Sequence, residues 1–266
     1  MEISGIIEKQ PFCQSQEHIK MNQIDLNNLD EFDFSMFPPS LLGRLSFQIT
    51  PAVNPPLPAG QHLLGIAEER DTLLIVPEGL EPGKPVPLLV MFHGAGGSAE
   101  KVLPFLEMHA KTNGFLLMIP QSTYPTWDIT IGGHGPDIER LEKALSVVSS
   151  CFNIDPQHFA FAGFSDGASY ALSTGITNGN LLSHVIVFSG GFMNVYQPEG
   201  KPRVFISHSP EDEQLNIKTS GLKHYNQLKK EGYDVHFQMF SGLHIIHPPV
   251  VEKAVSFFME KAPRHT

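Results

Sequence analysis

The sequence predicts an α/β fold in which a mostly parallel central sheet is covered by helices on both faces. Short apolar runs such as PLLVMFHG, residues 87–94, are typical of strands that are buried on both faces. Segments with helical character, about ten to fifteen residues long, alternate with these runs, as expected for a parallel sheet. A third observation is the length of 266 residues, which is sufficient for one large domain with a substantial core.

The first forty residues differ from the rest of the chain. The stretch NQIDLNNLDEFDFSMFPPS, residues 22–40, is acidic and rich in asparagine, and it shows no sustained hydrophobic period. We therefore expect an N-terminal extension over residues 1–40, either mobile or draped over the domain, and a domain over residues 41–266.

The first half of the domain is expected to hold four strands and two helices. RLSFQIT (44–50) and DTLLIVPE (71–78) are predicted edge strands joined by a Pro-rich loop, and 87–94 and 115–121 are predicted buried strands. A helix over 98–114 should end at Gly114, with Pro104 kinking or interrupting it. After a long loop, 122–135, a helix begins at Pro136, and its apolar stripe consists of Ile138, Leu141, Leu145, Val148 and Phe152.

The second half continues the alternation. The predicted strands are 158–165, 184–192, 203–209 and 235–242, and the predicted helices are 166–176, 220–233 and 248–262. The chain shows no internal repeat and no low-complexity tract. All these elements fit one sheet with helices on both faces.

Charge and cysteine content exclude several classes of protein. The net charge of −10, from 18 basic and 28 acidic residues, argues against nucleic-acid binding and against electrostatic docking on anionic lipid.

Cys13 and Cys151 are far apart, so unpaired thiols in a reducing compartment are expected. No secretory signal and no apolar run approaching eighteen residues is present, so we expect a cytoplasmic protein without a membrane span. The helices neither require nor exclude an oligomer.

The stretch GFSDG, residues 163–167, stands between a predicted strand and a predicted helix of small residues. A G-x-S-x-G motif at a strand-to-helix turn has the context that a nucleophile elbow requires. Gly163 and Gly167 keep bulk away from the tight turn, and the helix N-terminus favours negative charge beside the serine. Ser165 is therefore the predicted nucleophile.

A nucleophilic serine needs a histidine base, and the base needs an acid that orients it. Glu211, Asp212 and Glu213 follow one later strand, and His244 and His247 follow the next. The residues alone leave these alternatives open, although their order along the chain is the expected one. The histidine pair could also suggest a metal site, but no matching Cys/His/Asp cluster accompanies it, so neither a metal nor another cofactor is expected.

The oxyanion of an acyl-transfer reaction also needs hydrogen-bond donors. One should be the backbone N–H of Asp166, directly after the serine, and the other should come from the loop HGAGGSA, residues 93–99. Ala95 is the predicted donor in that loop, whereas His93 is expected to hold the loop by a hydrogen bond.

Several longer stretches resemble a known family. VMFHGAGGSAE, TWDITIGGHGPDIERLEKAL, AGFSDGASYALSTGITNGNLLSHVIVFSGGF and SHSPEDEQLNI are similar to the small serine esterases of the phospholipase/carboxylesterase group. This group belongs to the α/β-hydrolase superfamily, close to dienelactone-hydrolase-like and polyhydroxybutyrate-depolymerase-like esterases. The resemblance covers about residues 73–258. It implies the α/β-hydrolase fold, here without a large lid domain.

The resemblance also selects among the alternatives. The family's HGTxD segment matches residues 208–212, which selects Asp212 as the acid, and its G-x-H segment matches residues 242–244, which selects His244 as the base. Ser209 and Pro210 replace the usual Gly-Thr of the acid loop. The N-terminal forty residues have no counterpart in the family.

The expected function is hydrolysis of small-molecule carboxylic esters with short-to-medium acyl chains, through a Ser-His-Asp triad and an acyl-enzyme. A (lyso)phospholipase or acyl thioesterase is the main alternative, followed by a peptidase and by a non-catalytic binding protein on the same scaffold. The loop 122–135 lies at the predicted active-site edge, and Trp127, Tyr124 and His134 are candidate pocket residues. Trp127 has an alternative role, which is to pin this loop.

Overall fold

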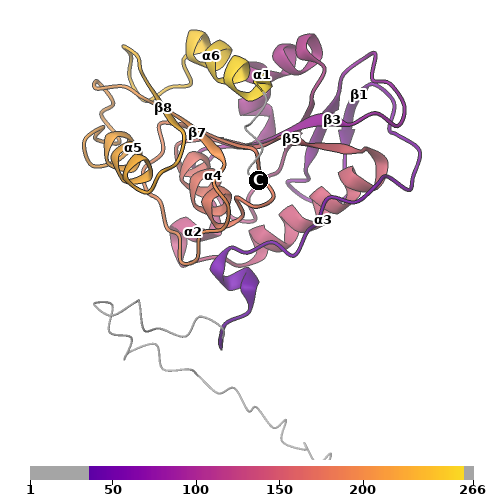
Figure 1. Cartoon of the computed structure of the whole chain (residues 1–266), viewed down its shortest axis with the longest axis horizontal. Coiled ribbons are helices and arrows are strands. Elements are labelled where there is room, and N and C mark those ends of the chain that lie inside the picture. Colours follow the sequence, from indigo (N-terminus) through magenta and orange to yellow (C-terminus); the bar gives the residue numbers. More distant parts are fainter. Residues whose placement is uncertain (1–35, 261–266) are drawn as a thin grey trace, which may run out of the picture. The chain divides into compact units, whose positions relative to one another are not determined.

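One mixed sheet organises the protein. The computed structural model describes residues 36–260, and this part of the chain contains an eight-stranded sheet in the order β1-β2-β4-β3-β5-β6-β7-β8 (Figure 1). Strand β2 runs antiparallel to both of its neighbours, whereas β4, β3, β5, β6, β7 and β8 are parallel. The strands are β1 (Gly60–Leu63), β2 (Leu73–Val76), β3 (Val86–Phe92), β4 (Leu116–Ile119), β5 (Ile154–Phe164), β6 (His184–Phe188), β7 (Arg203–His208) and β8 (Val235–Met239).

Helices cover both faces of this sheet, as the sequence predicts. Helices α1 and α6 lie on one face and α3, α4 and α5 on the other (Figure 1). Each face has its own cluster of buried apolar side chains. The helices are α1 (Ala99–Asn113), α2 (Asp128–Ile131), α3 (Pro136–Cys151), α4 (Asp166–Thr177), α5 (Gly221–Lys230) and α6 (Pro248–Met259), preceded by the 3-10 helix η4 (Pro39–Leu42).

The amphipathic pattern of α3 is confirmed, because all five residues of its predicted stripe are buried. Pro104 does not interrupt its helix. Helix α1 continues through Pro104 to its end, where Gly114 adopts a left-handed conformation with φ of 70°. Proline removes one N–H donor, but Val102, Leu106 and Ala110 of the same helix are buried against the sheet. Their burial keeps the helix continuous.

The segment 44–50 is not a strand, which corrects the prediction. Leu45 and Phe47 are buried, which explains the strand-like alternation, yet their backbone does not join the sheet. The N–H of Leu45 instead donates to Oδ1 of Asn178, and the N–H of Ser46 donates to the Glu142 carboxylate. The edge of the sheet is β1, which forms at the end of the Pro-rich loop, so β2, the other predicted edge strand, lies inside the sheet between β1 and β4. Alternation of apolar and polar residues indicates which side chains are buried, but it does not indicate the hydrogen-bond partners of the backbone.

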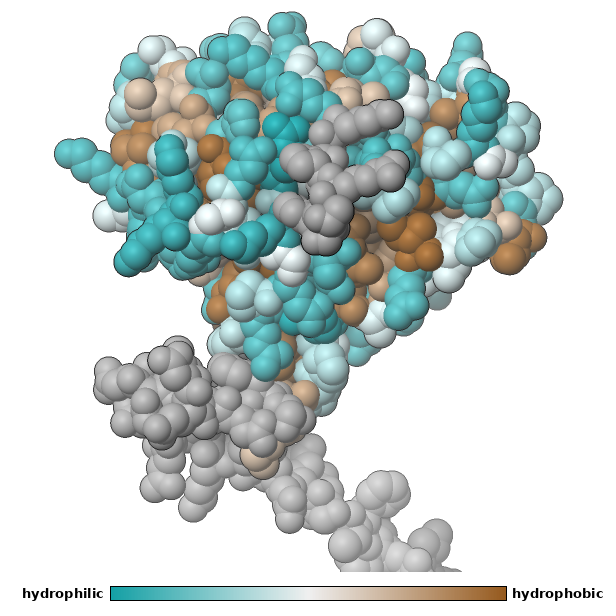
Figure 2. Space-filling view, in the orientation of Figure 1, coloured by the Kyte–Doolittle hydropathy of each residue, from teal (hydrophilic) through white to brown (hydrophobic). Residues whose placement is uncertain are grey.

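The surface of the described part is mixed. On the face shown in Figure 2, hydrophilic side chains are interspersed with hydrophobic ones. In residues 36–260, no helix has both the length and the apolar character needed to cross a bilayer. Most of the predicted N-terminal extension, including Cys13, lies outside the described residues. Cys151, at the end of α3, is a free thiol and is half-buried.

Candidate active site

Ser165 occupies a sharp turn between β5 and α4. Its backbone has φ of 56° and ψ of −121°, a conformation that costs a non-glycine residue about 1–3 kcal/mol. The turn is held because the Ser165 N–H donates to the carbonyl of Phe188, at 3.0 Å. A β-carbon on Gly163 would lie 2.6 Å from the backbone nitrogen of Ala168, and one on Gly167 would lie 2.6 Å from the Phe92 carbonyl carbon. Both glycines of the motif are therefore required by close backbone contacts.

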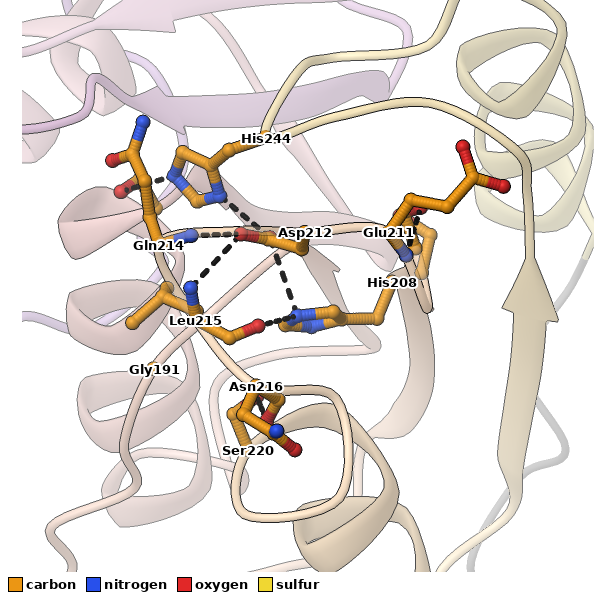
Figure 3. Close-up of polar contacts among 12 residues, drawn as sticks. Gly191, His208, Glu211, Asp212, Gln214, Leu215, Asn216, Ser220 and His244 are labelled. Atoms are coloured by element: carbon orange, nitrogen blue, oxygen red, sulfur yellow. Dashed lines mark hydrogen bonds and ion pairs between the residues drawn. The ribbon is translucent and has the colours of Figure 1, made fainter.

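Two further side chains, from loops that follow later strands, form a hydrogen-bonded chain with Ser165. Nε2 of His244, in the loop after β8, lies 2.8 Å from Oγ of Ser165. Nδ1 of His244 lies 2.7 Å from Oδ2 of Asp212, in the loop after β7 (Figure 3). Because a carboxylate only accepts hydrogen bonds, Nδ1 of His244 carries the ring proton and donates a hydrogen bond to Asp212. Nε2 is then free to accept the hydroxyl hydrogen of Ser165.

Asp212 is held as an anion. Its Oδ1 accepts the N–H groups of Gln214 and Leu215, each at 2.9 Å. Burial raises the pKa of Asp212, but the hydrogen bonds from His244 and from these two backbone groups outweigh burial, so the pKa lies below its usual value. Of the three acids considered from the sequence, Glu211 and Glu213 are exposed and Asp212 is buried.

His247 does not join this group. It is the N-cap residue of α6, and its ring packs at 5.1 Å from that of Phe240. Within residues 36–260, no three His, Cys, Asp or Glu side chains come together in a group that could hold a metal ion. The ring of His244 instead packs against Phe164, with centroids 4.9 Å apart.

His208 is a neighbour of the acid to which the sequence analysis gave no role. Its Nε2 lies 2.8 Å from the Leu215 carbonyl and 3.3 Å from Oδ2 of Asp212 (Figure 3). Burial lowers the pKa of His208, which favours a neutral ring whose Nε2–H donates to that carbonyl.

Ser209, which replaces the usual glycine, donates from Oγ to the carbonyl of Gly242. The unusual residue thereby ties the acid loop to the loop of His244.

The predicted oxyanion donors belong to the residue after Ser165 and to the loop after β3, where a β-carbon on Gly94 would lie 3.3 Å from Cβ of Ser165. Asp166 is the first residue of α4, so its N–H is one of those that have no acceptor within the helix. In the loop after β3, the N–H of Gly96 donates to Pro125 at 2.7 Å and that of Gly97 to Gly94 at 2.9 Å. The N–H of Ala95, in the same loop, has no acceptor among the described residues.

His93 fixes this loop. Its ring is completely buried, and burial lowers its pKa to about 4, so the ring is neutral. Nδ1–H donates to the Gly94 carbonyl at 2.8 Å, while Nε2 accepts the N–H of Ser122 at 3.1 Å and lies 3.1 Å from a guanidinium nitrogen of Arg70. These contacts agree with the expected supporting role of His93.

The three candidate pocket residues lie away from the cavity beside His244. Trp127 is 1% exposed, stacks on Tyr170 at 4.6 Å and donates from Nε1 to the His93 carbonyl at 2.7 Å. Of its two possible roles, these contacts correspond to holding the loop. His134 is buried against Tyr170, and neither ring nitrogen has a partner among the described residues. Tyr124 is 49% exposed and does not line that cavity.

The cavity beside His244 has a volume of about 430 Å³. It lies between the oxyanion loop and the loop of His244, and it is lined by Gly94, Ala95, Gly97, Lys101, Val102, Phe105, Phe164, His244, Ile245 and Ile246. Sequence reasoning missed Phe105 and Ile245 as pocket residues, although both stand close to motifs it identified. Another cavity, of about 420 Å³, is remote from Ser165, since it is lined by residues at the amino-terminal ends of β3 and β5.

No family model matches the chain, and no curated protein is similar to it in sequence. Solved structures do resemble it. Esterase PE8 aligns with a TM-score of 0.57 and 18% identity over 69% of this chain and 95% of that one. FphF, a fluorophosphonate-binding serine hydrolase of Staphylococcus aureus, aligns with a TM-score of 0.62 and 14% identity over 72% and 93%.

The S-formylglutathione hydrolase FrmB, also from Staphylococcus aureus, aligns with a TM-score of 0.60 and 15% identity over 71% of this chain and 92% of that one. Structural similarity at identities this low shows a common fold only. The reaction has to be argued from the residues of the site. The sheet order, the positions of the helices and these likenesses together show that the chain has the α/β-hydrolase fold.

Proposed function

We propose that the protein is a serine hydrolase that cleaves carboxylic esters through an acyl-enzyme. One observation carries the proposal, namely the continuous hydrogen-bonded chain from Asp212 through His244 to Ser165. The nucleophile lies on a strained turn at the carboxyl end of β5, and acid and base follow β7 and β8. This constellation suits nucleophilic attack on an acyl carbon.

In the acylation half, Oγ of Ser165 attacks the ester carbonyl carbon while its proton passes to Nε2 of His244. The N–H groups of Asp166 and Ala95 donate to the resulting oxyanion. Asp212 holds the imidazole in the correct tautomer and stabilises the imidazolium that forms. The bond between the acyl carbon and the alcohol oxygen then breaks, and this oxygen takes the proton from Nε2.

In the deacylation half, a water molecule attacks the acyl carbon and gives one proton to Nε2 of His244. Collapse of the second tetrahedral intermediate breaks the bond to Oγ, which takes the proton back. The sum is one ester and one water converted to one acid and one alcohol. Apart from the ester and the water, these steps use only side chains and backbone groups of this chain.

Modest substrate size is part of the proposal. The loop 122–135 contains only the four-residue helix α2, and the cavity beside His244 holds about 430 Å³. Esters of short-to-medium acyl chains fit a site of this kind better than bulk lipid does.

The test is turnover of p-nitrophenyl esters from acetate to decanoate by the protein and by Ser165→Ala. We expect the highest kcat/KM at a chain of about two to eight carbons and a loss of about 10³-fold or more in the variant. A butyryl thioester and a peptide p-nitroanilide, measured in parallel, compare the alternative hydrolase classes. Equal turnover by Ser165→Ala would refute the proposal.

A further inference from the structure

The cavity beside His244 contains one charged group in an apolar wall. Val102, Phe105, Phe164, Ile245 and Ile246 supply the apolar side chains that line it. Lys101 also lines it, from the first turn of α1. Its Nζ donates to the Gly96 carbonyl at 2.8 Å, so the ammonium is anchored on the loop that carries the proposed oxyanion donor.

No carboxylate pairs with this ammonium among residues 36–260. By contrast, Lys111, at the other end of α1, forms an ion pair with Glu107 at 2.6 Å. Glu100 precedes Lys101, but adjacent helix residues do not face one another. Lys101 uses one of its three hydrogen-bond donors on Gly96, which leaves two for a ligand.

The position of the cavity indicates which part of an ester it receives. His244 has to give its proton to the departing alcohol oxygen, so the alcohol part lies on the His244 side of the acyl carbon. The ring of His244 and the following residues Ile245 and Ile246 form one wall of the cavity. The cavity is therefore on the leaving-group side.

We propose that this cavity binds the alcohol part of the substrate, and that Lys101 recognises a carboxylate carried by it. The inference rests on the proposed ester hydrolysis and adds a substrate class, namely esters of apolar alcohols that end in a carboxylate. The apolar wall packs against the hydrocarbon part, and the ammonium pairs with the anion at the rim. Because Lys101 is exposed, the pair is worth about 1.5- to fivefold in kcat/KM.

The test compares two acetate esters of equal shape. 3-(4-Acetoxyphenyl)propanoate carries a carboxylate on its leaving group, and 3-(4-acetoxyphenyl)propanamide carries a neutral amide at the same position. The readout is the ratio of their kcat/KM values, since intrinsic ester reactivity largely cancels. Lys101→Met should lower the ratio about 1.5- to fivefold, Lys101→Glu should lower it further, and Lys101→Arg should largely restore it.

Two controls make the result specific. Lys111→Met removes a cation from the same helix about 15 Å away, at 1.5 Å rise per residue, and should leave the ratio unchanged. Raising the NaCl concentration should lower the ratio of the wild-type protein and leave that of Lys101→Met flat, because salt screens exposed charges.

Three outcomes would overturn the subsite. One is a ratio of the two kcat/KM values that stays the same in the Lys101 variants. Another is an effect seen only when the carboxylate is on the acyl side, as in p-nitrophenyl hydrogen glutarate against p-nitrophenyl butyrate. The third is failure to hydrolyse either acetoxyphenyl ester while p-nitrophenyl butyrate is turned over. Failure of the proposed function is distinguishable, because then no ester is hydrolysed in a Ser165-dependent way.

Discussion

Replacing Asp212 with asparagine should stop catalysis while leaving the fold intact. Oδ1 of Asp212 accepts two backbone N–H groups, from Gln214 and Leu215. In Asp212→Asn the amide oxygen has to take that position, which turns the NH₂ group toward Nδ1 of His244. Nδ1 must then accept a hydrogen bond, so the ring proton moves to Nε2. An Nε2–H facing Ser165 cannot accept the hydroxyl proton.

The expected loss is about 10³- to 10⁴-fold in kcat, which corresponds to about 4 to 5.5 kcal/mol of transition-state stabilisation. His208 offers no rescue, because its Nε2–H already donates to the Leu215 carbonyl. The assay is steady-state turnover of p-nitrophenyl butyrate at pH 8, with urea unfolding measured on the same samples. The unfolding midpoint should change little, since the asparagine keeps the two backbone hydrogen bonds.

Glu211→Gln and Glu213→Gln are the matched controls, because they neutralise the exposed acids on either side of Asp212. Each should retain kcat within about twofold, since exposed charges contribute little. The reasoning would be refuted by an Asp212→Asn protein that keeps more than a tenth of the wild-type kcat. It would equally be refuted by a glutamine variant that loses more activity than Asp212→Asn.

Two further predictions concern stability. Gly163→Ala should destabilise the protein by about 3 kcal/mol or more in urea unfolding, because the new methyl group meets the backbone of the next helix, whereas Gly132→Ala, with open space around it, should cost under about 1 kcal/mol. Equal costs would contradict the close packing at the turn. Burial lowers the pKa of His134 from 6.5 to about 4. Between pH 6.5 and pH 4 the unfolded chain therefore binds a proton at this histidine that the folded protein does not bind, so the free energy of unfolding decreases as the pH is lowered. Between pH 7.5 and pH 5, His134→Phe should lose about 2 kcal/mol less than the wild-type protein does; parallel losses would show that His134 is not held neutral.

Much of the site was predictable because its signals are local. The motif around Ser165 needs glycines where backbones nearly touch, and Gly163 and Gly167 are such positions. Strand order then places the loops after β7 and β8 near the serine, since carboxyl ends of parallel strands share one edge. Asp212 and His244 could therefore be placed among the possible partners of Ser165 before any distance was known, and the family resemblance selected them from their acidic and histidine neighbours.

The mispredicted strand and the buried side chain of Trp127 show where sequence reasoning ends. The alternation of Leu45 and Phe47 is real, but their backbone groups bond to Asn178 and Glu142, which are far away in sequence. No local pattern reveals such partners. Trp127 looked like a pocket residue because it stands in an active-site loop, yet its ring is buried on Tyr170.

The cavity walls depended on tertiary contacts for the same reason. They come from α1 and from the loop of His244, which are more than a hundred residues apart in the chain. Lys101 looked like an ordinary helix lysine, and only the fold places it beside the catalytic loops. The specificity proposed for this cavity thus rests on contacts between segments that sequence patterns treat separately.

The most direct test of the central claim is to react the protein with a fluorophosphonate at neutral pH and locate the adduct by peptide mass spectrometry. The account predicts one adduct per chain, on Ser165, with labelling slowed strongly in His244→Ala. An unlabelled protein, or an adduct on another residue, would contradict the claim that Ser165 is the nucleophile of a serine hydrolase.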